Sequence, residues 1–169
     1  MGTRSDYYIG KGKKIEWLGS TAWDGYPDGG GLTKSHPAVM QATDERAFRT
    51  AVGEMLAKRE DATLPEHGWP WPWDDSRTTD FAYTFDEGKA WLSNFGRKWV
   101  PVAEYLAWDE VRRDEYSDEG KEVVFPNMKA QKRVTFGRRS GVMVLGLTPE
   151  GPKVIEDKDE RGESGLPGQ

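Results

Sequence analysis

Cysteine is absent from this chain of 169 residues, and histidine occurs only at His36 and His67. Without cysteine there is no disulfide, no thiolate nucleophile and no cysteine-ligated zinc cluster. Neither histidine stands in an HxxxH, HxH or GxSxG context, as a zinc centre or a Ser-His-Asp relay would require. We therefore interpret both histidines as ordinary loop residues and expect neither a metal centre nor a cofactor.

Long apolar runs are missing as well. No stretch approaches the roughly 18 apolar residues of a membrane-spanning helix, and the first residues contain no apolar signal-peptide core. We therefore expect a cytoplasmic protein that does not contact the membrane. An excess of basic residues is also missing, because the net charge is −5. General coating of DNA requires a basic face, so this composition does not favour it.

What the chain does contain is aromatic residues. Eight Trp, six Tyr and six Phe accompany a low apolar fraction of 36%. Since each aromatic side chain can bury about 150–250 Å², these residues offset the shortage of aliphatic ones. The length suits one ordinary domain. We expect a single domain over residues 1–147 with an aromatic-rich core, followed by a flexible acidic tail over residues 148–169.

Two segments have the pattern of β-hairpins. Residues 5–9 and 15–23 are rich in β-forming residues and flank the turn-like GKGKK. The more apolar face of the second strand is assigned to the core, and it carries Ile15, Trp17, Gly19 and Thr21. Further along, DFAYTF and AWLSNF flank the turn DEGK, whose glycine suits the left-handed position.

One segment has a clear helical pattern. Residues 43–59 carry an apolar stripe at helical spacing, formed by Phe48, Val52, Met55 and Leu56. Thr43 is the expected N-cap. Gly53 costs roughly 1 kcal/mol relative to Ala inside a helix, which suggests close packing at that position.

The remaining segments predict shorter elements. Residues 98–106 have a strand pattern in which Pro101 marks a sheet edge or the start of a helix, and a charged helix then ends at Gly120. A short strand over 121–125 and a last hairpin over 133–147 follow. The prediction is an α+β fold in which antiparallel β-hairpins form a sheet packed against one main amphipathic helix.

The loop WDGYPDG at 23–29, with two more glycines behind it, is the first candidate site. Its glycines permit a sharp exit from the strand, and Asp24 and Asp28 are interpreted as caps of their own turns. The two carboxylates could instead bind Mg²⁺ or Ca²⁺, and the glycines could hold a phosphate. However, neither an EF-hand pattern nor a following GK[ST] is present. Together with Trp23 and Tyr26, this loop is the first place to test for a ligand.

A second candidate lies in the long connection over residues 60–79. There Trp69, Trp71 and Trp73 alternate with prolines, which stiffen the backbone. Exposed, the three indoles would form a recognition surface, since Trp is enriched among binding hot spots. Buried, they would pin the connection to the body of the protein. Both alternatives stay open.

Two further candidates are weaker. The main basic cluster contains Lys129, Lys132, Arg133, Arg138 and Arg139. With the lysines of GKGKK it could meet phosphates, although solvation of hairpin turns is the simpler explanation. Thr3 could act as an N-terminal nucleophile only if both Met1 and Gly2 were removed. We favour the start of an edge strand there.

A resemblance adds information on lineage. MGTRS at 1–5 and WDGYPDG at 23–29, separated by a hairpin, resemble small proteins of phages, prophages and integrated mobile elements. FAYTFDEGKAWL at 81–92 is similar to a hairpin of the same proteins. Many of these proteins have histidine before the tryptophan, where this chain has Ala22. The resemblance covers about a quarter of the chain and assigns no catalytic residue.

Three hypotheses of function follow. The first is a non-enzymatic module that binds a host protein or protein complex, as an inhibitor of host defence such as an anti-CRISPR protein would. The second is a small hydrolase, either of the N-terminal-nucleophile type or assisted by a metal at Asp24 and Asp28. The third is a nucleic-acid binder that uses the basic turns. The first is favoured because of the resemblance and because no catalytic constellation is visible in the sequence.

Overall fold

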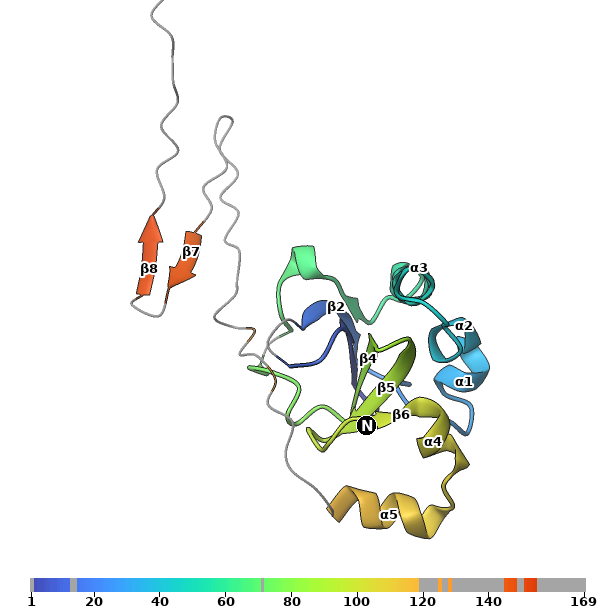
Figure 1. Cartoon of the computed structure of the whole chain (residues 1–169). Coiled ribbons are helices and arrows are strands. Elements are labelled where there is room, and N and C mark those ends of the chain that lie inside the picture. Colours follow the sequence, from blue (N-terminus) through green and yellow to red (C-terminus); the bar gives the residue numbers. More distant parts are fainter. Residues whose placement is uncertain are drawn as a thin grey trace, which may run out of the picture. The chain divides into compact units, whose positions relative to one another are not determined.

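The computed structural model describes residues 2–12, 15–70, 72–118, 125, 128, 145–148 and 151–154. The chain divides into two units, Met1–Lys129 and Ala130–Gln169. The first unit combines a six-stranded sheet with several helices (Figure 1). The α+β fold class predicted from the sequence is therefore confirmed.

The sheet has the strand order β3-β2-β1-β4-β5-β6. Its strands are β1 (Ser5–Ile9), β2 (Glu16–Thr21), β3 (Ala62–Thr63), β4 (Phe81–Asp86), β5 (Lys89–Asn94) and β6 (Val100–Pro101). The antiparallel pairs β1–β2 and β4–β5 confirm both predicted hairpins. β1 and β4 run parallel to each other, so the sheet is mixed rather than assembled from antiparallel pairs alone.

β1 is an interior strand of this sheet, not the edge strand expected from the sequence. It lies between β2 and β4, and all five of its residues are buried. A strand covered on both faces need not alternate between apolar and polar residues. This explains why SDYYI carries Asp6 and two tyrosines in succession without exposing any of them.

One face of the sheet packs against helices. α3 (Glu45–Ala57) buries its predicted stripe in full, namely Phe48, Val52, Met55 and Leu56. The short helices α1 (Leu32–Ser35) and α2 (Pro37–Met40) lie beside α3 and add Leu32 and Val39 to the same core (Figure 1). From the sheet, this core receives Tyr7, Ile9, Phe81, Tyr83, Phe85 and Leu92.

Two details of α3 differ from the sequence prediction. The N-cap is Asp44 rather than Thr43, because the Asp44 carboxylate accepts a hydrogen bond from the backbone N–H of Ala47 at 2.8 Å. Gly53 is exposed, and a Cβ added there would meet no atom within 4 Å. The predicted close packing at Gly53 is therefore wrong.

The opposite face of the sheet is covered by a connection rather than by a helix. Tyr8, Trp17 and Ala82 form a second cluster there with Trp69 and Phe125. A β-bulge between Tyr7 and Tyr8 shifts the register, so that Tyr7 lies opposite Gly19 and Tyr8 opposite Trp17. The predicted single core face of the second strand is therefore split. Trp17 belongs to the second cluster, whereas a Cβ at Gly19 would meet Leu56 of α3.

The strand predicted over residues 98–106 is wrong for most of its length, although both expectations for Pro101, a sheet edge and a helix start, are met. β6 consists of two residues at the edge of the sheet, and α4 (Val102–Ala107) begins directly after Pro101. α5 (Glu110–Asp118) is the predicted charged helix. The long connection before β4 contains β3 and a single 3₁₀ turn, η2 (Pro65–His67).

The second unit contains one described element pair. β7 (Leu145–Thr148) and β8 (Gly151–Val154) form an antiparallel hairpin. The predicted tail was placed from residue 148 onward, so its first described residues are strand residues. The predicted strand 121–125 lies outside the described residues except for Phe125. The predicted hairpin 133–147 and the remainder of the tail are likewise outside them, apart from 145–147. Along the described part of the chain, no helix combines the length and apolarity needed to cross a membrane.

Candidate functional site

The WDGYPDG loop leaves β2 and is fixed at its first turn by buried contacts. The backbone N–H of Gly25 donates to the carbonyl oxygen of Thr3 at 2.9 Å. The buried Tyr83 hydroxyl, from the central strand β4, donates to the Gly25 carbonyl at 2.8 Å. A Cβ at Gly25 would lie 2.6 Å from the Cβ of Ser5, so only glycine fits this close approach.

A carboxylate from the segment between α3 and β3 fixes the start of the loop. Asp61 accepts hydrogen bonds from the backbone N–H groups of Ala22 at 2.9 Å and Trp23 at 3.1 Å. Arg59 pairs with Asp61 through two hydrogen bonds and also donates to the Trp23 carbonyl at 2.9 Å. Burial alone would raise the pKa of Asp61, but the hydrogen bonds and the charge of Arg59 lower it. Asp61 is therefore held as the anion that the loop needs.

The end of the loop is anchored by its own glycines. Gly31 donates to the Asp28 carbonyl at 2.8 Å, and Leu32 donates to the Tyr26 carbonyl at 2.7 Å. A Cβ at Gly31 would lie 2.1 Å from the Tyr26 carbonyl oxygen, so no larger residue fits. The loop backbone is consequently held at its start, middle and end.

Two aromatic side chains project from this fixed backbone. Trp23 is 47% exposed and Tyr26 is 49% exposed. Beside them is a half-open hollow of about 510 Å³, lined by Asp24, Tyr26, Asp28, Gly29, Gly30, Gly31, Ser35 and Arg59. The structure thus brings Asp24, Tyr26 and Asp28 together around one hollow, and it adds Arg59 from the segment between α3 and β3.

The acidic residues of the loop do not behave as predicted. The Asp28 carboxylate pairs with Arg113 of α5 instead of capping its own turn. Asp24 has a positive φ of 58°, and no hydrogen bond joins its carboxylate to a described residue of the turn. Among the described residues, no group of three or more metal-ligating side chains exists.

The two histidines are also separated. Burial, together with the nearby charges of Arg59 and Lys58, lowers the pKa of His36. His36 follows α1 and is thus a neighbour of the hollow, whereas His67 closes the η2 turn. They share no site in the part of the chain that the structure describes.

The tryptophan-proline segment resolves into an anchor and a surface residue. Trp69 is 5% exposed and meets Trp17 edge to face, with ring centroids 4.8 Å apart. Trp73 is 37% exposed, and its ring lies 4.0 Å from the Arg4 guanidinium carbon. Trp71 lies outside the described residues. The sequence left burial and exposure of these tryptophans open. Trp69 is buried and Trp73 is partly exposed.

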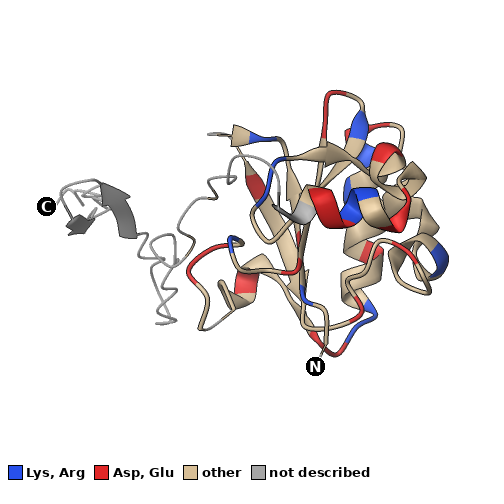
Figure 2. Ribbon diagram, turned by 90° about the horizontal axis from the view of Figure 1, so that it is seen from below, with Lys and Arg blue, Asp and Glu red and all other residues tan. Residues whose placement is uncertain are grey.

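Charges of both signs are mixed over the first unit. Figure 2 shows Lys and Arg interspersed with Asp and Glu over its helices and loops, while its strands carry few charges. The predicted basic cluster, from Lys129 to Arg139, lies outside the described residues, as do Lys13 and Lys14. Lys11 is paired with Glu87 at 3.0 Å.

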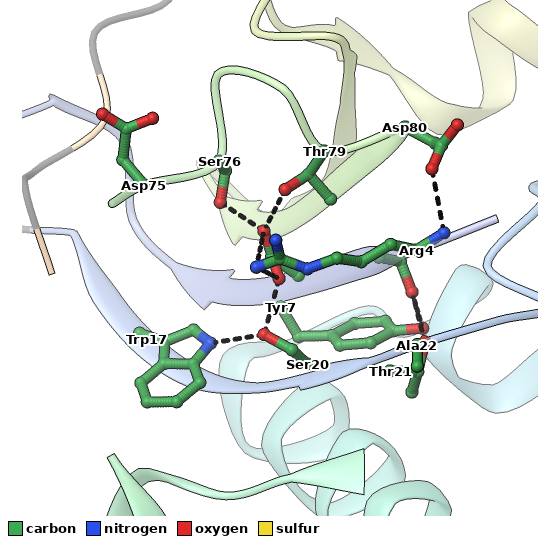
Figure 3. A network of polar contacts seen from close by, with 12 residues as sticks. Arg4, Tyr7, Trp17, Ser20, Thr21, Ala22, Asp75, Ser76, Thr79 and Asp80 are labelled. Atoms are coloured by element: carbon green, nitrogen blue, oxygen red, sulfur yellow. Dashed lines mark hydrogen bonds and ion pairs between the residues drawn. The ribbon is translucent and has the colours of Figure 1, made fainter. Parts of the chain in front are cut away.

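Sequence reasoning missed a buried polar network on the tryptophan side of the sheet (Figure 3). Asp6 is fully buried and pairs with Arg4 at 2.9 Å. The hydroxyls that donate to the same carboxylate are Ser20 at 2.5 Å, Ser76 at 2.5 Å and Thr79 at 2.7 Å. Arg4 and Asp6 are two apart in a strand and so share a face, which was the one signal available.

This network ties the long connection to the central strand. Ser76 also meets the Tyr8 hydroxyl at 2.5 Å, and the backbone N–H of Arg4 donates to Asp80 at 3.0 Å. Ser20, Ser76 and Thr79 are all buried, so their hydroxyls face one another rather than solvent. Thr3, the proposed nucleophile of the hydrolase alternative, is only 5% exposed. The arrangement is that of a structural clamp.

In comparisons with known proteins, no family model, no curated protein and no solved structure matches this chain.

Proposed function

We propose that the chain is a non-enzymatic protein-binding module that uses the WDGYPDG loop as its contact surface. The supporting observation is the pair Trp23 and Tyr26, each about half exposed on a backbone that buried hydrogen bonds hold in place. Single exposed apolar residues are ordinary, but Trp and Tyr are the residue types that are enriched among binding hot spots. The proposal concerns this loop, and Trp73 is secondary because Arg4 already covers its ring.

The physical reason lies in the entropy of binding. Ordering a loop at an interface costs free energy, and a loop that is already ordered avoids this cost. Trp and Tyr present a large contact area for few rotatable bonds, and both are enriched among residues that dominate binding energy. The hydrogen bonds that Asp61 and Tyr83 make to the loop backbone therefore favour recognition of a partner over a purely structural role for the loop.

The lineage and the partner rest on the sequence resemblance alone. We propose a phage or mobile-element origin, a cytoplasmic location and a partner that is a host protein or protein complex. An inhibitor of host defence, of the anti-CRISPR kind, is the specific form of this proposal. Support for a non-enzymatic role comes from the polar residues gathered around Asp6, which are buried away from any substrate.

A comparison of variants tests the loop. The immobilised protein is exposed to lysate of a bacterial host, and the retained proteins are quantified by mass spectrometry against the Trp23→Ala/Tyr26→Ala double variant. We expect the double variant to lose a specific host protein, with an affinity for the purified partner at least about tenfold weaker. Its fold should be unchanged, because the anchoring contacts are made by backbone groups.

Phe95→Asn provides the matched control. Phe95 is 51% exposed and has a positive φ of 47°, which asparagine tolerates. This variant removes a similar exposed aromatic area far along the chain and should retain the partner in full. Equal retention by the wild type and the double variant would contradict the proposed contact surface.

A further inference from the structure

A second hollow lies at the other end of the sheet and was not foreseen from the sequence. It encloses about 490 Å³ between the β5–β6 edge and the helices α4 and α5. Its aromatic walls are Trp91, Trp99, Trp108 and Tyr116. We call it the aromatic groove. Its volume is in the range of small-molecule sites, about 300–1,000 Å³.

The aromatic walls are held in place by contacts behind them. The Trp91 indole N–H donates to the Asp86 carbonyl at 2.9 Å, and the Tyr116 hydroxyl donates to the Lys98 carbonyl. Trp99 packs edge to face on buried Phe125, with centroids 5.5 Å apart. Trp108 packs on Tyr116 at 5.3 Å. The groove is therefore preorganised, although Trp91, Trp99 and Trp108 each keep part of their surface exposed.

Four charged side chains complete the lining. They are Lys98, Glu104, Arg112 and Glu115. None of the four belongs to an ion pair with a described residue, although eight other ion pairs occur in the same part of the chain. Lys98 and Arg112 instead lie over the rings of Tyr116 and Trp108, at 5.9 and 5.6 Å. Among the described residues, the groove thus offers hydrogen-bond donors and acceptors that belong to no ion pair, beside aromatic faces.

The balance of these charges selects the class of ligand. Two cations and two anions sum to zero, so neither a phosphate nor a polycation is favoured by the net charge. A purely apolar ligand would strip water from four charges without compensation. A neutral ligand with an apolar face and many hydroxyls satisfies both constraints. We infer that the aromatic groove binds a neutral oligosaccharide. Its C–H faces stack on the indole faces that Lys11, Lys89 and Arg112 do not cover, while its hydroxyls bond to the charged side chains.

A glycan array that spans neutral, sialylated and sulfated glycans tests this inference. The expected result is selective retention of neutral glycans. Calorimetric titration of the best neutral glycan should then give the same affinity at low and high salt, because no net charge is neutralised. Trp108→Ala should weaken this affinity by about tenfold or more.

A second groove variant that leaves every aromatic ring in place, and a control variant outside the groove, complete the test. Glu115→Gln changes one charged group on a helix surface without removing a ring, and it should weaken binding several-fold. The Trp23→Ala/Tyr26→Ala variant should bind the glycan unchanged, so the groove is tested separately from the proposed protein contact. The inference is overturned if the protein retains only acidic glycans or retains no neutral glycan on the array. It is also overturned if both Trp108→Ala and Glu115→Gln bind the neutral glycan with unchanged affinity.

Discussion

Asp6 carries a carboxylate in the interior strand β1 with none of its side chain exposed. Removing such a group from water costs several kcal/mol, which only close partners can offset. Arg4 supplies the opposite charge, and hydroxyls from β2 and from the long connection supply hydrogen bonds. The same Arg4 guanidinium lies between the rings of Trp69 and Trp73, at 5.4 and 4.0 Å. This pair therefore joins the sheet to the tryptophan segment.

Asp6→Asn tests the importance of the buried pair. The amide leaves the Arg4 charge buried without its partner, so we expect a loss of about 3–5 kcal/mol in the free energy of unfolding. Glu16→Gln is the control, because it breaks an ion pair to Arg49 in which both side chains are at least one-third exposed. That change should cost at most about 1 kcal/mol. Urea unfolding followed by fluorescence measures both. Similar losses in the two variants would contradict a special role for Asp6.

At the scale of single elements, α3 follows local rules closely. Its stripe, its acidic first turn and its cap are all encoded within a few residues, and the structure uses them nearly as predicted. The cap differs by one residue because Asp44, not Thr43, has the extended backbone that lets its carboxylate reach the N–H of Ala47. The packing around Gly53 cannot be predicted from the helical pattern alone, since only the tertiary structure shows that this side of the helix faces solvent.

Gly53→Ala should therefore stabilise the protein. The position is exposed and has room for a methyl group, so alanine should gain about 0.5–1 kcal/mol by reducing the freedom of the unfolded chain. The measurement is the urea midpoint at constant slope. Gly31→Ala is the matched control and should destabilise, because its Cβ would lie 2.1 Å from the Tyr26 carbonyl oxygen. A lower midpoint for Gly53→Ala would mean that the site is packed after all.

At the scale of the whole first unit, tyrosines are buried on both faces of the sheet. Burial raises the pKa of Tyr7 to about 12, and it also raises the pKa of Tyr8 and Tyr83. In the unfolded chain a tyrosine ionises near a pKa of about 10. Each buried tyrosine has a higher pKa in the folded state than in the unfolded chain. Its neutral form therefore contributes to the free energy of unfolding, and this contribution is fully present below pH about 10. It is lost as the pH rises from there toward about 12, since the unfolded state releases its protons first.

An alkaline titration should show this coupling. We expect the phenolate absorbance of the buried tyrosines to appear together with the loss of near-ultraviolet circular dichroism, in one cooperative step above pH about 10. In concentrated urea the same groups should titrate near pH about 10 without cooperativity. Ionisation of all tyrosines near pH about 10 with the fold intact would contradict the burial of Tyr7, Tyr8 and Tyr83.

The sequence by itself determined the elements whose patterns are local. Both hairpins of the sheet and the stripe of α3 depend on residues a few positions apart, and both were predictable. It also marked the WDGYPDG loop, whose glycines are needed for close approach at Gly25 and Gly31. These features follow from periodicity and from backbone sterics, which act over short distances.

Only the tertiary structure decided which distant residues meet. The parallel pairing of β1 with β4 makes SDYYI an interior strand, and the bulge at Tyr7 and Tyr8 sends Trp17 to the face opposite Gly19. The burial of Trp69 beside Trp17 and the placement of Trp91 and Trp108 around the same aromatic groove arise in the same way. The reason is physical. Such contacts depend on how the whole chain shares a limited buried volume, and no local pattern carries that information.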